Sequence, residues 1–408
     1  MKLSLYLPLF LALGVTSCSY YSDEENLHAK DLYFNVDLDS RINLFDFYQS
    51  VSYVVLEKTN QNLLGSIDKM IIAGNKLFVL DTKSNKLASY SCNGRFIMET
   101  ENLGKGPLEY LSIWDFDVDT INNVIEYFDR GKSRMVQITL DGKFIGSRPV
   151  LIYASDFCKL SNNYYVFASY NYPSAHHNND LSYNAVVFDS NNKQKALFLP
   201  MTRLKSLFHV TFNRLVRYGL GANMVIPYDN KIYFITQDSC IAKYVLHYNK
   251  FEIPTDFIDQ YDANKGIGNQ SELIAHKEFL DKLNSGNYII SMRNLFESEE
   301  ILQYQFRISM NPDIYTAVYF KRLNQACAGV MENNLDFGPV GNPLALQNDT
   351  LYTCIYPSEI RERIAYVEKN YKLSGEALTR FQAMKAQLGD VKETDNPVIG
   401  KFCIRKDL

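Results

Sequence analysis

Five aspartates crowd the stretch between residues 115 and 141, and paired carboxylates are the groups that cleave glycosidic bonds. They are Asp115, Asp117, Asp119, Asp129 and Asp141. An aspartate at a strand end or turn accepts hydrogen bonds from nearby backbone N–H groups, and this explains the same residues without catalysis. We therefore interpret them as strand-end and turn residues, with a hydrolytic pair as the alternative.

A second group of candidates combines aromatic rings with imidazoles in a polar, Asn-rich loop. Tyr170, Tyr172, His176 and His177 lie there, and Trp114 is the single tryptophan of the chain. Tyrosine and tryptophan rings can stack on sugar rings, although most such rings pack in a core. Two adjacent histidines do not complete a metal's coordination shell. The sequence thus offers these five residues as candidate ligand contacts, and it predicts no metal site and no cofactor.

Other motifs of known chemistry are missing from the sequence. Gly104 and Gly106 are spaced as in a phosphate loop, but Pro107 follows them and no helix opens with Lys-Ser or Lys-Thr. We interpret this segment as a turn between two repeated units. The G-x-S-x-G elbow of serine hydrolases is absent, as is the S-x-D-x-G-x-T-W box of sialidases. The sequence therefore favours a protein without catalytic activity.

A repeated β unit must position these candidates. The runs at 75–81 and 123–129 are short and β-prone, begin with Asn, end with Asp and are offset by 48 residues. The same offset relates Asn93–Gly94 to Asp141–Gly142, and both dipeptides are signals for a two-residue hairpin turn. Further strand-like runs complete a four-stranded antiparallel unit. Tandem units of this size predict the blades of a propeller.

Looser copies downstream bring the predicted count to six blades. A strand at 52–57 and the last strand at 398–404 are expected to complete one blade from both ends of the chain, which removes exposed sheet edges. Residues 255–285 and 358–389 break the β pattern and predict short helical insertions. We therefore expect an all-β, six-bladed β-propeller over residues 31–408.

Residues 1–17 have the features of a signal peptide. Lys2 provides a positive start, and the apolar stretch behind it is too short to span a membrane. The sequence Val-Thr-Ser before Cys18 resembles the lipobox of bacterial lipoproteins, which implies cleavage before Cys18 and a lipid on that cysteine. Residues 18–30 are then a lipidated tether. The alternative is a plain secretory signal followed by an incidental cysteine.

The residues after Cys18 bear on the location of the protein. Ser19 stands where an aspartate would resemble an inner-membrane retention signal, so the resemblance implies the outer membrane. The acidic Asp23, Glu24 and Glu25 resemble the export tag of surface lipoproteins in Bacteroidota. A solvated tether on the periplasmic face would carry similar charges. We expect a surface-exposed protein, with the periplasmic face as the alternative.

Two further segments carry a family resemblance. The sequence GKGPLEY at 104–110 and the sequence DNPV at 395–398 resemble those of six-bladed, NHL-like β-propeller lipoproteins of Bacteroidota. Leu108 departs from that pattern, which often has glycine there, and this affects the loop more than the fold. The resemblance covers most of the chain and is strongest over residues 63–146. It implies a propeller at the cell envelope and transfers no catalytic residue.

Composition limits the possible partners. The chain of 408 residues has a net charge of −4 and no run of Lys and Arg interleaved with aromatics, so nucleic-acid binding is disfavoured. Hydrophobic residues make up 46%, which is enough for a folded core. The six cysteines after Cys18 form no C-x-x-C pair, which excludes the common zinc signatures. We expect them to be free, although an exported location permits disulfides.

Two functions remain open at this point. The first is a non-catalytic binding or scaffold protein of the outer membrane, held by its lipid, with a glycan, a peptide or an envelope protein as partner. The alternative is a polysaccharide-acting hydrolase or lyase whose site assembles from different blades at one mouth of the propeller. Such a site would bring acidic, basic or His side chains together at the axis.

Overall fold

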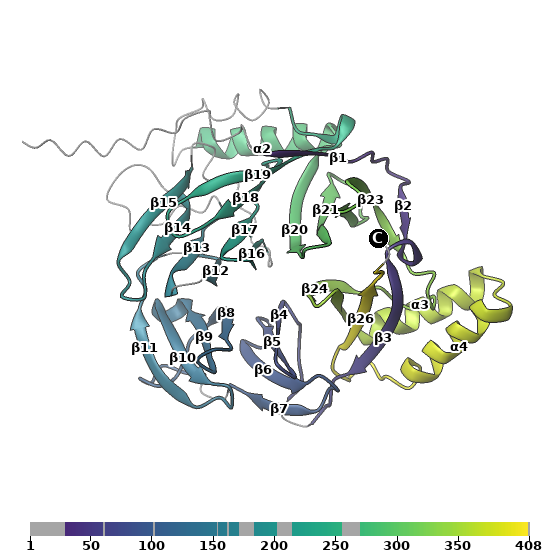
Figure 1. Cartoon of the computed structure of the whole chain (residues 1–408), viewed down its shortest axis with the longest axis horizontal. Coiled ribbons are helices and arrows are strands. Elements are labelled where there is room, and N and C mark those ends of the chain that lie inside the picture. The colour runs from purple at the N-terminus through teal and green to yellow at the C-terminus, as the bar shows by residue number, and fades with distance from the viewer. Residues whose placement is uncertain are drawn as a thin grey trace, which may run out of the picture.

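The computed structural model arranges the chain as a ring of six β-sheets (Figure 1). The predicted all-β, six-bladed propeller is confirmed. No helix in the described part of the chain is both long enough and apolar enough to cross a membrane. The structure describes residues 29–59, 62–100, 103–152, 154–160, 163–170, 183–201, 214–254 and 270–406, with side chains of the 270–285 helix described from residue 277 on.

Each sheet contains a four-stranded antiparallel meander, and we name these blades A to F in chain order. The first strand of each blade lies nearest the centre of the ring in Figure 1. Blade A comprises β4 (Lys69–Ala73), β5 (Lys76–Asp81), β6 (Lys86–Ser91) and β7 (Phe96–Glu99). Blade B comprises β8 (Ile113–Asp119), β9 (Val124–Asp129), β10 (Arg134–Thr139) and β11 (Phe144–Pro149). Blade C comprises β12 (Asp156–Lys159), β13 (Tyr165–Ala168), β14 (Tyr183–Phe188) and β15 (Gln194–Pro200).

The second half of the ring repeats this order and receives three strands from the N-terminal segment. Blade D comprises β16 (Leu215–Tyr218), β17 (Gly221–Met224), β18 (Lys231–Ile235) and β19 (Cys240–His247), with β1 (Lys30–Tyr33) at its edge. Blade E comprises β20 (Ile289–Glu297), β21 (Ile301–Ile308), β22 (Tyr315–Phe320) and β23 (Gln325–Glu332), with β2 (Arg41–Asn43) at its edge. Blade F comprises β24 (Asn342–Gln347), β25 (Thr350–Ile355), β26 (Val398–Ile404) and β3 (Tyr48–Val55).

The ring closes through both ends of the propeller, as predicted. β3 pairs antiparallel with β26, from Tyr48 opposite Ile404 to Val55 opposite Val398. The N-terminal segment also adds β1 and β2 as parallel edge strands on blades D and E, which the sequence did not predict. These additions cover the backbone groups that an outer strand would otherwise leave unpaired.

The two predicted hairpins are present, but their turns are longer than two residues. In the first, the backbone N–H groups of Ser91 and Gly94 donate to the carbonyl groups of Arg95 and Ser91, both at 2.8 Å. Gly94 has a φ of +88°, whereas the preceding asparagine is not in the positive-φ region, and a bulge follows in the β6–β7 pairing. Gly142 repeats the same φ of +88° between β10 and β11. Only the glycine therefore needs the left-handed conformation, as in a type I turn with a glycine bulge.

The hydrophobic core is divided into clusters that lie between neighbouring blades. Each of the six blade interfaces holds one such cluster within the described residues. At the A–B interface, for example, Phe78 of β5 and Phe116 of β8 are both fully buried. Burial of both faces of each sheet is what holds a ring of separate blades together.

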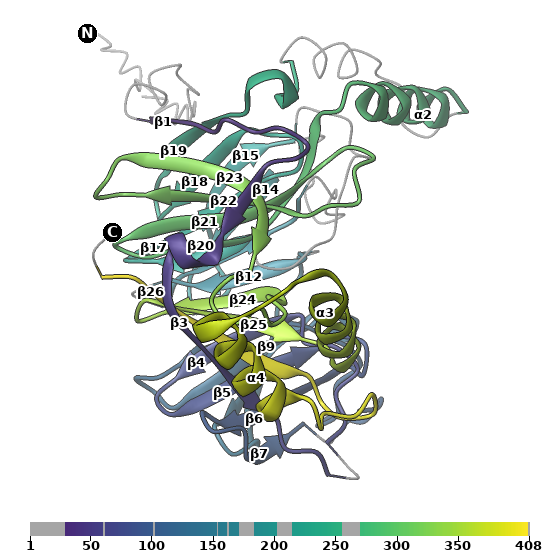
Figure 2. The ribbon, with the colours of Figure 1, turned by 90° about the vertical axis from the view of Figure 1, so that its right-hand side faces the viewer.

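Three α-helices lie within the described residues and match the two predicted insertions: α2 (Gln270–Ser285), α3 (Pro357–Asn370) and α4 (Gly375–Leu388). Residues 255–269 of the first insertion lie outside the described part of the chain. Phe381, Met384 and Leu388 of α4 pack against Tyr53 of β3 in blade F. Figure 2 shows α2 and α3 displaced toward the same face of the ring. The six cysteines after residue 18 are free.

Candidate functional site

Charged side chains from the inner strands of blades A to D meet at the centre of the ring, and we call them the axial network. Its members are Lys69 of β4, Asp115 and Asp117 of β8, Asp156 of β12, and Arg214 and Arg217 in and just before β16. The inner strands of neighbouring blades touch all around the ring. The acidic and basic groups that the hydrolase alternative requires at the axis are therefore present.

Asp115 is the most completely enclosed member of the network. Its Oδ1 lies 2.7 Å from Nζ of Lys69, and its Oδ2 accepts the backbone N–H of Phe157 at 2.8 Å. The carboxylate thus joins blade B to blades A and C. Burial raises the pKa of Asp115, and the ammonium group of Lys69 opposes this shift.

Asp156 titrates in an unusual range for a carboxylate. It accepts a hydrogen bond of 2.7 Å from the hydroxyl of Tyr170. Burial, followed by the negative charge of the neighbouring Asp115, raises the pKa of Asp156 to about 7. A carboxyl group with such a pKa can hold or release a proton near neutral pH, which is a property of general acids.

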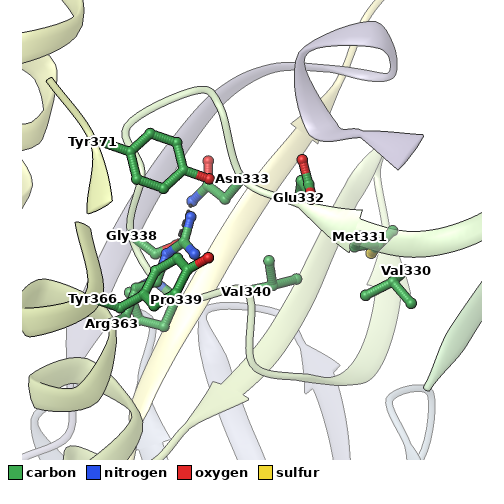
Figure 3. Close-up of a pocket in the computed structure, with 10 residues that line it drawn as sticks. All are labelled: Val330, Met331, Glu332, Asn333, Gly338, Pro339, Val340, Arg363, Tyr366 and Tyr371. Carbon is green, nitrogen blue, oxygen red and sulfur yellow. Dashed lines mark hydrogen bonds between the residues drawn. The ribbon is translucent and has the colours of Figure 1, made fainter. Parts of the chain in front are cut away.

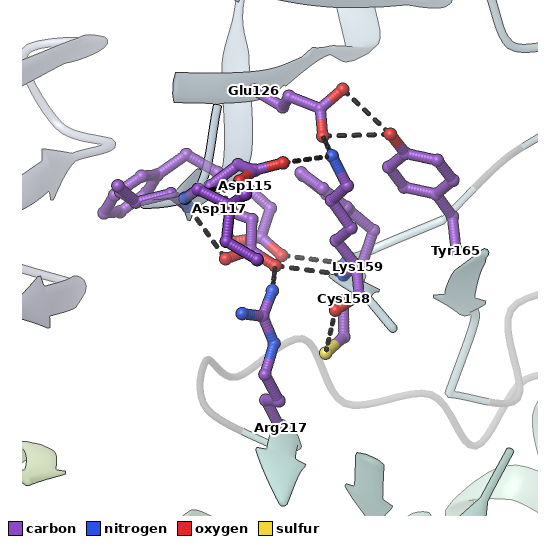
Figure 4. Close-up of polar contacts among 12 residues, drawn as sticks. Asp115, Asp117, Glu126, Cys158, Lys159, Tyr165 and Arg217 are labelled. Carbon is purple, nitrogen blue, oxygen red and sulfur yellow. Dashed lines mark hydrogen bonds and ion pairs between the residues drawn. The ribbon is translucent and has the colours of Figure 1, made fainter. Parts of the chain in front are cut away.

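Asp117 begins a second layer of contacts between blades B, C and D (Figure 4). Its Oδ2 lies 2.6 Å from a terminal nitrogen of Arg217 and accepts the backbone N–H of Lys159 at 2.9 Å. The ammonium group of Lys159 in turn pairs with Asp119 at 2.7 Å and with Glu126 at 3.2 Å. These contacts join neighbouring blades. The carboxylates and Lys159 are largely buried, whereas 45% of the Arg217 side chain is exposed.

The strand-end interpretation holds for three of the five aspartates. Asp119 accepts the N–H groups of residues 121 and 122, and Asp129 accepts those of residues 111 and 112. Asp141 accepts the hydroxyl of Thr139 in its turn. The interpretation is wrong for Asp115 and Asp117, which lie within β8 rather than at its end and bind the backbone and the cations of other blades. Asp119 ends β8 and also pairs with Lys159 of blade C.

The glycine segment that resembles a phosphate loop is filled by a side chain of its own. The Glu109 carboxylate accepts the backbone N–H of Gly106, and a Cβ on Gly104 would lie 2.2 Å from Oε2 of Glu109. Lys132 donates to the carbonyl groups of Gly106 and Glu109 at 2.6 and 2.5 Å. The segment is a pinned turn between blades A and B, as the sequence predicted.

The aromatic candidates are placed differently from one another. Tyr170 is buried, with 1% of its surface exposed, so its ring presents no open face to a sugar. Trp114 is half-buried, and the guanidinium carbon of Arg130 lies 4.0 Å from the centre of its ring system. Tyr172, His176 and His177 lie outside the described residues, as does the lipidation candidate Cys18. Ligand binding by this group remains a prediction.

A pocket of about 230 Å³ lies between the edge of blade E and the helices of blade F, and we call it the rim pocket (Figure 3). Two exposed tyrosines and an arginine form the wall on the helical side, whereas β23 and the loop behind it form the rest. The lining residues are Val330, Met331, Glu332, Asn333, Gly338, Pro339, Val340, Arg363, Tyr366 and Tyr371. No group of three or more His, Cys, Asp or Glu in the described part of the chain could hold a metal ion.

Arg363 is the charged centre of the helical wall. Its Nε donates to the carbonyl of Phe337 at 2.9 Å, and its guanidinium carbon lies 5.6 and 6.0 Å from the ring centres of Tyr366 and Tyr371. Among the described residues no carboxylate lies within ion-pair distance of it. Tyr366 and Tyr371 expose 51% and 38% of their surfaces. The pocket therefore presents a positive group flanked by two accessible rings.

The loop behind β23 is fixed to the core of blade F. Asn333 donates to Asp336 at 2.7 Å and to the carbonyl of Gly338 at 3.1 Å. Asp336 accepts the hydroxyl of Tyr53 at 2.8 Å, and a Cβ on Gly338 would lie 2.4 Å from that hydroxyl oxygen. The pocket floor is thus preformed, and glycine is required where the loop crosses the tyrosine.

The sequence from residue 31 to residue 402 matches the model of the family DUF4934, which is described as a domain of unknown function. The chain belongs to the DUF4934 family. No curated protein matches it.

Comparison with solved structures shows that the fold of this DUF4934 chain occurs in another protein. The chain is similar to a Bacteroides fragilis protein provisionally described as exported, with 17% identity, a TM-score of 0.70, and coverage of 92% of this chain and 99% of that one. A DUF4221 family member from Bacteroides vulgatus gives 8% identity and a TM-score of 0.49, with coverage of 88% and 97%. At such identities the first likeness shows a shared fold.

Sequence reasoning missed the rim pocket of this DUF4934 chain. One signal was readable, because Arg363 and Tyr366 are three residues apart on a predicted helix and so share a face. Glu332 and Tyr371 come from a strand in another blade and from the segment after the helix, and only the folded ring brings them together.

Proposed function

We propose that this chain is a non-catalytic binding protein of the bacterial envelope, held to the outer membrane by a lipid on Cys18, with the rim pocket as its ligand site. One observation supports this most directly. The charges of the axial network are engaged with one another and with backbone groups of adjacent blades, whereas Arg363 faces an open pocket beside two exposed rings.

The engagement of the axial charges argues for a structural role. The Asp115 carboxylate accepts hydrogen bonds from the ammonium group of Lys69 and from two backbone N–H groups. The Asp117 carboxylate forms an ion pair with the guanidinium of Arg217 and accepts the backbone N–H of Lys159. A substrate would have to displace the largely buried Lys69 from Asp115, or the half-exposed Arg217 from Asp117, and a buried carboxylate without its partner is costly. We therefore infer that these groups stabilise the contacts between blades and do not bind a ligand.

The rim pocket has the features of a recognition site. Tyrosine and arginine are enriched among residues that dominate binding energy. Tyrosine offers a large contact surface with few rotatable bonds, and arginine offers several hydrogen-bond donors. The fixed loop behind β23 leaves little conformational entropy to lose on binding.

A binding screen tests this function. The full chain, purified in detergent, is applied to a glycan array, and cells expressing it are treated with a crosslinker to capture envelope partners. We expect a ligand in at least one screen whose retention depends on Tyr366, which is 51% exposed. Retention should survive replacement of Tyr33, a tyrosine on blade D that is 70% exposed. Empty results in both screens would refute the proposal.

The lipid anchor has its own test. Cys18→Ala should abolish incorporation of radiolabelled palmitate and release the chain from the membrane fraction. Protease added to intact cells should degrade the wild-type chain if it faces outward. Protection from protease would place the chain on the periplasmic face instead, and unchanged lipid labelling of the variant would refute the anchor.

A polysaccharide-acting hydrolase or lyase is the second candidate, and Asp156 is the observation that favours it. This carboxyl group lies at the axis beside Asp115 and has a pKa of about 7. Pooled polysaccharides incubated with the chain should remain intact under our proposal. Release of reducing ends or unsaturated products by the wild type, but not by Asp156→Asn, would establish the second candidate in its place.

A further inference from the structure

The donors of Arg363 define what the rim pocket can bind. A guanidinium group carries five N–H donors, and the Nε donor of Arg363 is used by the carbonyl of Phe337. That bond fixes the plane of the group and leaves the terminal nitrogens facing the pocket (Figure 3). Two parallel N–H groups on a fixed fork match the two oxygens of a carboxylate.

Other arginines of the two helices form ion pairs with glutamates, and Arg363 differs from them. Arg361 pairs with Glu393, and elsewhere on α4 Arg380 pairs with Glu376 at 3.4 Å. Arg363 contacts no carboxylate among the described residues, although it is half-buried between Tyr366 and the loop of Phe337. The terminal nitrogens of Arg363 are therefore a defined position at which an anionic group of a ligand could bind.

The rings and the size of the pocket limit the ligand further. Tyr366 and Tyr371 lie 6.1 Å apart with their planes at 63°, which gives two walls that meet at an angle. The volume of about 230 Å³ lies below the ~300–1,000 Å³ of pockets for drug-sized molecules. A single ring with polar edges fits such a space better than a length of peptide. Tyrosine, with an apolar ring and a polar tip, suits a partner of that kind.

The charge pattern gives the ligand an orientation. Glu332 lies across the pocket from Arg363 and is half-exposed, with Arg41 at 3.7 Å from its carboxylate. A second anionic end would be repelled there, whereas hydroxyl groups would find an acceptor. The pocket is therefore complementary to a molecule with a carboxylate at one end and hydroxyl groups at the other.

We propose that the rim pocket binds a carboxylate-bearing sugar residue of a glycan, with its carboxylate on Arg363, its ring against Tyr366 and Tyr371, and its hydroxyl groups toward Glu332. This inference rests on the binding function proposed above and names the ligand class of that same site.

Matched pairs of probes test the ligand class. The full chain in detergent is titrated calorimetrically with trigalacturonate and with its methyl ester, and with 3′-sialyllactose and with lactose. We expect the acidic member of at least one pair to bind about tenfold more tightly than its neutral partner, or better. Equal binding within both pairs, or no binding of either acidic probe, would overturn the inference.

Variants of one helix assign the effect to Arg363. Arg363→Met should reduce binding of the acidic probe to the level of the neutral one, and Arg363→Lys should also weaken it because an ammonium group lacks the fork. Arg361→Met is the control and should bind as the wild type does. If Arg363→Met fails to fold, the ratio of acidic-probe to neutral-probe affinity in Arg363→Lys tests the guanidinium fork, and Tyr366→Ala, which alters a half-exposed ring, tests whether the acidic probe binds in the rim pocket. Full binding by the folded variants would overturn the inference.

The outcome also separates this inference from the proposed function. A neutral glycan or an envelope protein whose capture depends on Tyr366 would leave the binding function standing and refute the acidic sugar. Empty binding screens would refute both.

Discussion

Two arginines of this propeller differ in their partners: the one at the axis has a carboxylate within the protein, and the one at the rim pocket has none among the described residues. Arg217 at the axis lies 2.6 Å from Asp117, which also accepts a backbone N–H of the next blade. Arg363 at the rim donates a hydrogen bond from its Nε to the carbonyl of Phe337, and its remaining nitrogens point toward a pocket with two exposed tyrosines. The same side chain thus stabilises a fold where its partner is built in, and can recognise a ligand where the partner is missing. Four predictions test this comparison, beginning with the largest effect.

Asp115→Ala should cause the largest loss of stability. The substitution leaves the ammonium group of Lys69 buried without its carboxylate, and such a loss costs about 3–5 kcal/mol. Urea denaturation followed by circular dichroism measures the free energy of unfolding. A change below about 0.5 kcal/mol would show that the axial charges do not hold the blades together.

The pH dependence of unfolding should identify Asp156. Its pKa is raised from 3.8 to about 7 in the folded state, so between these values the folded chain binds a proton that the unfolded chain has lost. Its contribution to stability is therefore present at low pH and is lost as the pH rises toward 7, at no more than ~1.4 kcal/mol per pH unit. Asp156→Asn should remove this slope. Urea midpoints at about pH 5 and about pH 8 that shift equally in the variant and the wild type would contradict the assignment.

Tyr366→Ala should affect binding rather than folding. The ring is half-exposed, so the free energy of unfolding should change by less than about 1 kcal/mol, whereas affinity for the captured ligand should fall about tenfold or more. Calorimetric titration measures the affinity, and Tyr33→Ala serves as the control. A variant that binds normally would move the ligand site away from the rim pocket.

Arg361→Met should have the smallest effect. This arginine pairs with Glu393 on the surface, and exposed ion pairs contribute about 0–1 kcal/mol. Neither the urea midpoint nor ligand affinity should change appreciably. A clear loss of binding would mean that positive charge on α3 attracts the ligand in general, without a specific role for Arg363.

The sequence predicted the parts of this fold that repeat locally. The turns Asn93–Gly94 and Asp141–Gly142 recur at a fixed offset because blades A and B use the same hairpin between their two outer strands. The pairing of β3 with β26 follows from closing the ring. The sequence did not predict β1 and β2, because strands this short show little of the alternation between apolar and polar residues that identifies a strand.

The candidate sites were harder to predict for a different reason. Strand periodicity alone cannot tell that Asp115 and Asp117 face the neighbouring blades, since either face of an inner strand is buried. The rim pocket joins Glu332 to Arg363 and Tyr371 across two blades, so its composition exists only in the folded ring.

A direct comparison of Arg217→Met with Arg363→Met tests the central claim, which is that axial charge stabilises the ring and rim charge binds the ligand. Both full-length variants are titrated with the acidic probe that the wild type binds, and their urea midpoints are measured in the same buffer. We predict that Arg363→Met loses about tenfold or more in affinity, with no more fall in midpoint than the loss of its one hydrogen bond to the Phe337 carbonyl causes, about 1 kcal/mol. Arg217→Met keeps its affinity and unfolds at lower urea. Loss of binding in Arg217→Met together with normal binding in Arg363→Met would contradict the account.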